Sequence, residues 1–294
     1  MRQAIPPVLL SILISLVLQA AANAQTNKPR APQDGESTVI FSVNKYEEAP
    51  TIQIEPIVII RSGRYIAPPV DAEPAVTKKF TDTYFRPGRR YRVVFGGGDA
   101  GTLTVQKEIE PGCVGLTAEV VAQTTARLGG QVQALAVSSD NIGRGESSRR
   151  APTEDERAEA LDVARSVYAQ RRVGVALIKK INTVNLTATD LERDGKFELI
   201  GSFEIRGANY VAYNLFIIFE RTAAGKYKAA WTWYKKGAEI DFESRSLVDA
   251  VDLDGDGTAE VIAGGSYYES NDYVIYKRQA GTWRPIYRGG GGGC

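Results

Sequence analysis

The chain has 294 residues, with 36 lysines and arginines, 35 aspartates and glutamates, two cysteines and no histidine. A formal net charge of +1 gives no support for binding to nucleic acid or to an acidic surface. The lack of histidine excludes Ser-His-Asp triads, Cys-His dyads and most zinc sites, whereas catalysis by a pair of carboxylates stays possible.

The N-terminus has the three parts of a secretory signal peptide. Arg2 supplies the positive start, residues 8–18 form an apolar core too short for an ordinary transmembrane helix, and Ala22-Asn23-Ala24 fits a cleavage site. An uncleaved anchor is the alternative. We therefore expect a signal peptide over 1–24, a disordered polar leader over 25–36, and a mature chain that is secreted or periplasmic.

Short β-branched runs broken by prolines predict an N-terminal β-rich domain over 37–138. Within it, the spacing of Val76, Phe80 and Tyr84 predicts a short helix. The glycine-rich stretch 96–101 lies between two strand-like segments. A phosphate-binding loop would be followed by a helix that begins with Lys-Ser/Thr, so a hairpin turn is the better interpretation.

A linker is expected over 139–152, followed by a helix over 153–173. Thr153 and, three residues later, Glu156 match a capping box at the start of this helix, and Gly174 is expected to end it.

The region 174–288 contains an internal repeat. Residues 190–200 align with residues 252–262, which lie 62 positions later. Each copy predicts four strands, near 181–189, 197–205, 211–220 and 227–234 in the first and near 246–251, 260–268, 273–278 and 282–287 in the second.

Both aligned segments contain carboxylates at positions 1, 3, 5 and 9 and a glycine at position 6. Ca²⁺ is the natural partner of so many hard oxygen ligands in one turn, because it prefers six to eight of them. The helix-loop-helix calcium site has its last carboxylate at position 12, which is Gly201 or Ala263 here, so that interpretation fails. The alternative is an Asp-Gly hairpin turn without an ion.

This pattern resembles the FG-GAP/VCBS calcium-loop repeat, which also forms integrin alpha-subunit propellers. The resemblance implies two propeller-blade-like units of four strands each, too few to close a propeller ring. It implies two calcium ligand sets: Asp252, Asp254, Asp256, the Thr258 carbonyl and Glu260; and Asp190, Glu192, Asp194, the Lys196 carbonyl and Glu198. Arg193, Lys196 and the longer Glu192 depart from the family pattern, so the first site is expected to be weaker or unfilled.

The two cysteines, Cys113 and Cys294, are expected to form a disulfide because an exported chain meets an oxidising environment. The stretch 289–294 is expected to be a flexible glycine tether that ends in Cys294. An intermolecular bridge, a free thiol and an added glycine-cysteine tag are the alternatives.

These features predict a mainly β (α+β) protein: an N-terminal β-rich region, a connecting helix and two blade-like repeats. The leading hypothesis is an exported calcium-binding protein with a binding or structural role at the cell envelope or outside the cell, its partner an unknown protein or glycan. The alternative is a carbohydrate-binding or carbohydrate-active protein that uses an acidic pair and surface aromatic residues such as Trp231 and Trp233, although such residues more often fill a core. A role as an enzyme is less favoured than a role without catalysis.

Overall fold

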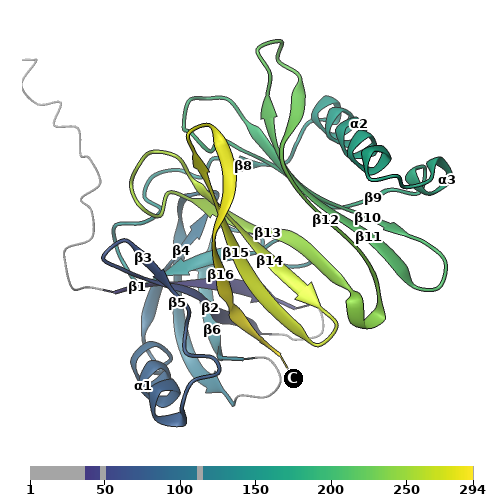
Figure 1. The fold of residues 1–294 in the computed structure, drawn as a ribbon. Helices are drawn as coiled ribbons and strands as arrows, with labels where there is room; N and C mark the ends of the chain where they lie inside the picture. Colours follow the sequence, from purple (N-terminus) through teal and green to yellow (C-terminus); the bar gives the residue numbers. More distant parts are fainter. Residues whose placement is uncertain (1–36, 47–50, 111–114, 294) are drawn as a thin grey trace, which may run out of the picture. The chain divides into compact units, whose positions relative to one another are not determined.

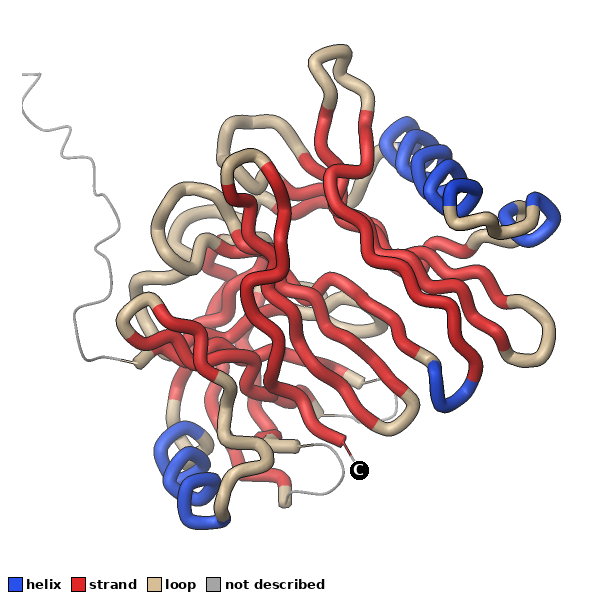
Figure 2. The backbone as a smooth tube through the Cα atoms, in the orientation of Figure 1, coloured by secondary structure: helices blue, strands red, loops and turns tan. Residues whose placement is uncertain are grey.

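The computed structural model describes residues 37–46, 51–110 and 115–293. The chain is mainly β, as predicted (Figures 1 and 2). The predicted signal peptide, the leader and both cysteines lie outside the described residues. Within these residues, no helix combines the length and the apolar character needed to cross a membrane.

The N-terminal region forms a closed antiparallel barrel. Its strands are β1 (Thr38–Lys45), β2 (Ile52–Arg61), β4 (Arg90–Phe95), β5 (Gly98–Ile109), β6 (Thr117–Thr124) and β7 (Ala134–Val137). They follow the order β1-β7-β4-β5-β6-β2, and the pairing of β1 with β2 closes the ring. The short β3 (Arg64–Ile66) extends β2 as a hairpin. Helix α1 (Pro74–Tyr84), which the sequence predicts, adds Phe80 to the barrel core.

Two antiparallel sheets follow the barrel along the chain. The first contains β8 (Arg149–Arg150), β9 (Asn182–Thr189), β10 (Glu198–Arg206), β11 (Val211–Arg221) and β12 (Tyr227–Ala238). The second contains β13 (Glu243–Val251), β14 (Glu260–Tyr267), β15 (Ser270–Gln279) and β16 (Thr282–Gly293), after the short 3₁₀ helix η1 (Glu239–Asp241). All eight predicted strands of the duplicated region are present, several of them longer than expected.

The barrel, the second sheet, the first sheet and the two helices that follow residue 153 pack in this order as successive layers (Figure 1). Val58 on the outside of the barrel packs with Ile275 of the second sheet. The other face of that sheet meets the first sheet in a core that contains Val261 and Ile218. The far face of the first sheet is covered by α2 (Glu154–Gln170) and α3 (Val175–Ile178). Each sheet therefore buries both faces.

Helix α2 starts as the sequence predicts. Thr153 is the N-cap, its side chain accepts a hydrogen bond from the backbone N–H of Glu156, and the Glu156 carboxylate accepts one from the backbone N–H of Thr153. The expected linker before it contains a strand, β8, which pairs with β9.

The expected glycine tether is wrong for residues 289–293, because these glycines continue strand β16. Gly289 pairs with Tyr273, and Gly293 pairs with Ser270. A β-carbon at Gly291, whose φ is 77°, would lie 2.1 Å from the carbonyl oxygen of Asn271. Glycine is therefore needed here for a close approach of two backbones.

Candidate cation site in the second acidic loop

The second acidic loop joins β13 to β14 and is anchored at both ends. Leu253, its second residue, is buried in the core between the second sheet and the barrel. Glu260 is the first residue of β14 and is fully buried. The exposed part of the loop, with Asp254 and Asp256, is therefore held between two fixed points.

Carboxylates within the loop organise its backbone. Asp252 accepts hydrogen bonds from the N–H groups of Gly255 (2.7 Å) and Gly257 (2.9 Å), one on each oxygen. Both glycines have positive φ, at 79° and 92°, as a tight turn requires. Glu260 accepts one from the Leu253 N–H at 2.8 Å, and the N–H of half-buried Thr258 donates to Asp256 at 2.9 Å.

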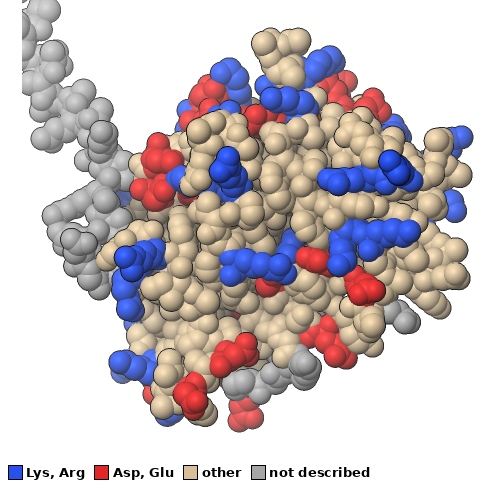
Figure 3. Space-filling model, in the orientation of Figure 1, with Lys and Arg blue, Asp and Glu red and all other residues tan. Residues whose placement is uncertain are grey.

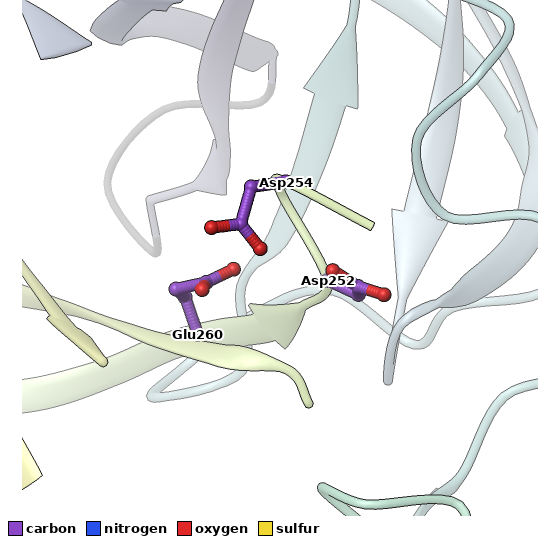
Figure 4. A group of neighbouring side chains, drawn as sticks. All are labelled: Asp252, Asp254 and Glu260. Atoms are coloured by element: carbon purple, nitrogen blue, oxygen red, sulfur yellow. The ribbon is translucent and has the colours of Figure 1, made fainter. Parts of the chain in front are cut away.

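Three of the predicted ligands converge. One carboxylate oxygen each from Asp252, Asp254 and Glu260 lie within 4.8 Å of one another (Figure 4). Among the described residues, acidic or cysteine side chains gather in this way only here. The donor set is entirely hard oxygen, which fits Ca²⁺.

A lysine that sequence reasoning missed completes the cluster. The Lys277 ammonium, from β15, lies 2.6 Å from Asp254 Oδ2, 2.7 Å from Asp256 Oδ2 and 2.8 Å from Glu260 Oε1. Its side chain is only 13% exposed. The clue in the sequence is the register of the predicted hairpin, which brings this part of β15 beside the start of β14.

The cluster shifts the ionisation of its members. Burial raises the pKa of Glu260 to about 7, against the lowering effect of Lys277. Burial alone would lower the pKa of Lys277, but hydrogen bonds to Asp254, Asp256 and Glu260 raise it well above its usual value. The site therefore favours a positive charge at its centre.

In the first acidic loop, carboxylates accept hydrogen bonds from backbone N–H groups in the same way. Asp190 accepts hydrogen bonds from the N–H groups of Asp194 (3.1 Å) and Gly195 (2.8 Å). Glu198 accepts one from Leu191 at 3.1 Å. Burial raises the pKa of Glu198 to about 7.

The predicted ligands of the first loop do not converge. Glu192 forms an ion pair with Arg278 of β15. Asp194 is paired with Lys196 at 2.6 Å, and the Arg193 guanidinium donates to the carbonyl of Gly97 in the barrel at 2.7 Å. Two of the four carboxylates in this loop are therefore paired with separate basic side chains.

Trp231 and Trp233 fill a core, which is the more usual role of such residues, and do not form a surface platform, because both side chains are half-buried against the core between the two sheets. The Trp231 ring lies 4.4 Å from that of Tyr276. The exposed aromatic rings lie elsewhere. Tyr210 is 85% exposed and Tyr268 is 59% exposed. Both line a groove of about 680 Å³, together with Phe242, Glu204, Arg206 and Tyr267, among others.

The surface carries both signs of charge, as Figure 3 shows for one face. Comparison of the chain with protein-family models, with curated proteins and with solved structures finds no match.

Proposed function

We propose that this chain is an exported β-repeat protein that binds Ca²⁺ in its second acidic loop and has a structural or binding role at the cell envelope or outside the cell. The convergence of Asp252, Asp254 and Glu260 on a preorganised turn carries this proposal. Asp256 and the Thr258 carbonyl would complete the ligand set. The ion would supply positive charge to this acidic turn and tie the end of β13 to the start of β14.

The proposal includes FG-GAP/VCBS-like blades, which the placement of the repeats supports. Residues 62 positions apart occupy equivalent places, and each residue of the first copy lies one layer further from the barrel than its counterpart. The pairs are Leu199 and Val261, Ile200 and Ile262, and Leu191 and Leu253. The barrel then takes the place of a third blade, and helix α2 covers the opposite end of the stack.

Thermal melting in Ca²⁺ and in EDTA tests the calcium proposal. An ion that binds only the folded state stabilises it by about 2.7 kcal/mol at a hundredfold excess over Kd. We expect the melting temperature to rise in Ca²⁺ and this rise to be lost in Asp254→Asn. The position-equivalent Glu192→Gln serves as the control and should keep it. A wild-type melt that Ca²⁺ leaves unchanged would refute the proposal.

A second candidate is glycan binding, favoured by the exposed tyrosines of the 680 Å³ groove. Tyr210 and Tyr268 offer ring faces for stacking on a sugar, and Glu204 and Arg206 offer hydrogen bonds. A glycan-array screen should show a glycan that the wild-type protein binds and that the Tyr210→Ala variant does not bind. Tyr46→Ala, at another exposed tyrosine, should leave this binding intact. Equal loss in both variants would argue against the groove.

A further inference from the structure

Lys277 lies where the carboxylates of the second loop point. Its ammonium contacts three of the four acidic side chains that the calcium proposal needs: Asp254, Asp256 and Glu260. Each contact is 2.8 Å or shorter. An ammonium and a Ca²⁺ ion that use the same three carboxylates cannot both be held there at full strength, because they share these carboxylates and the two positive charges repel each other.

The lysine is specific to the second copy. The equivalent cross-strand pairs are Leu199–Phe219 in the first copy and Val261–Tyr276 in the second. The next residue along the strand is Glu220 in the first copy and Lys277 in the second. Glu220 points to other partners, since it accepts a hydrogen bond from Trp283 Nε1 at 2.9 Å and pairs with Arg278 at 3.0 Å. The loop whose carboxylates converge is therefore the loop in which one lysine contacts three of them.

We propose that Lys277 is a built-in competitor of Ca²⁺, so that ion binding releases its side chain from the second loop. This inference rests on the proposed calcium function and concerns the regulation of that site. At low Ca²⁺ the ammonium supplies the positive charge and keeps the loop folded. At high Ca²⁺ the ion replaces it, and the freed amine becomes accessible to solvent.

Competition raises the calcium concentration that the site needs. The apparent Kd equals the intrinsic Kd divided by the fraction of molecules whose site is open. If the ammonium fills the site for about 90% of the time, the apparent Kd rises about tenfold. The loop would then respond to a change in Ca²⁺ rather than hold the ion permanently.

The first test compares calcium affinity by isothermal titration calorimetry. Lys277→Met removes the charge but keeps most of the side-chain length, and we expect it to bind Ca²⁺ at least about tenfold more tightly than wild type. It should also melt at a lower temperature in EDTA, because the carboxylates lose their counter-ion. Lys226→Met is the matched control, since Lys226 pairs with Glu159 at 2.6 Å away from both loops. This control should keep the wild-type affinity.

The outcomes separate the two proposals. Equal or weaker calcium binding by Lys277→Met, with wild type binding normally, would overturn competition and leave the calcium function standing. Binding by neither protein would overturn the calcium function and the competition with it.

A second test uses the wild-type chain, so it does not depend on the folding of a variant. Lysines are acetylated with a brief pulse of reagent, and the Lys277 peptide is quantified by mass spectrometry in Ca²⁺ and in EDTA. Competition predicts severalfold faster acetylation of Lys277 in Ca²⁺, with Lys226 unchanged. Acetylation of Lys277 that stays equal or slows under saturating Ca²⁺ would overturn the proposal.

Discussion

Asp249 in β13 accepts a hydrogen bond from the backbone N–H of Gly96 in the turn between β4 and β5, at 2.8 Å. Its other carboxylate oxygen accepts one from Arg149 at 3.3 Å. The Asp249 side chain is 1% exposed, so this is a buried connection between the barrel and the second sheet. The predicted hairpin turn thus connects the barrel backbone to the repeat region.

Substitution of Gly96 by alanine tests that connection. A β-carbon there would lie 2.3 Å from the Ser147 hydroxyl oxygen and 2.4 Å from the Arg149 β-carbon, at a φ of 59°. Gly225 has a similar positive φ of 77°, but a β-carbon there would meet nothing within 4 Å. Gly225→Ala therefore measures the cost of the positive φ alone. We expect a loss of about 1 kcal/mol for Gly225→Ala and about 3 kcal/mol or more for Gly96→Ala, measured by urea unfolding. Equal losses would mean that the close approach is not important for stability.

The Glu156 carboxylate makes folding stability depend on pH. Hydrogen bonds from Arg150, at 2.7 and 2.8 Å, are the largest cause that lowers the pKa of Glu156 to about 2. Because this pKa is lower than the unfolded-state value of about 4.3, the ionised carboxylate stabilises the folded state, and this contribution is fully present above a pH of about 4.3. This stability is lost as the pH falls from about 4.3 to about 2, with a total of about 3 kcal/mol.

Glu156→Gln should therefore flatten the pH dependence of the unfolding free energy in that window. Glu154→Gln is the control, because Glu154 lies in the same first turn of α2 but is exposed. Identical profiles for the two variants would contradict the assignment.

Local patterns in the sequence predicted much of this fold correctly. The capping box at Thr153 and Glu156 needs only four consecutive residues, so it could be predicted before any tertiary contact was known. The spacing of the second acidic loop likewise predicted that Asp252, Asp254 and Glu260 lie together, but the same spacing does not bring the carboxylates of the first loop together. The strands of both repeats were predicted because their apolar runs are long and are bounded by turn residues.

Features that depend on packing between distant segments could not be predicted in this way. Lys277 reaches the second loop only because β15 pairs with β14 in one particular register. The sequence favours a core position for Trp231 but does not show which sheet covers it. Glycines 289–293 predicted a flexible tether because glycine is unfavourable in strands, yet they continue β16, and at Gly291 the close backbone of Asn271 leaves no room for a β-carbon.

The ranking of the two loops gives a further prediction. Asp252 and Asp190 each accept two backbone hydrogen bonds within their loops, so substitution of either by asparagine should disturb its turn to a similar degree. We expect Asp252→Asn to remove the tighter calcium binding seen by calorimetry and Asp190→Asn to preserve it. The physical reason is that Arg278 and Lys196 engage Glu192 and Asp194 in the first loop. Loss of the tighter site in Asp190→Asn alone would reverse the ranking.

The final prediction is the disulfide between Cys113 and Cys294. Both cysteines lie outside the described residues, but their neighbours in the sequence are close together. A β-carbon at Gly115 would lie 2.7 Å from the carbonyl oxygen of Gly291 and 3.1 Å from the α-carbon of Gly292. Cys113 is two residues before Gly115, and Cys294 is two residues after Gly292. Segments this short can bring two α-carbons within the distance of about 7 Å that a disulfide allows.

Peptide mapping of secreted protein without reduction tests this pairing directly. We expect one cross-linked peptide that joins residues 113 and 294, and Cys294→Ser should instead expose a single alkylatable thiol. Because the bridge would close a long loop from residue 113 to residue 294, the chain-entropy model credits it with about 5 kcal/mol, so reduction should lower the melting temperature. Two alkylatable thiols in the wild-type protein, or a dimer that reductant dissociates, would show that the cysteines are not paired within one chain. In either case the contact between Gly115 and Gly291 would need to be held by backbone packing alone.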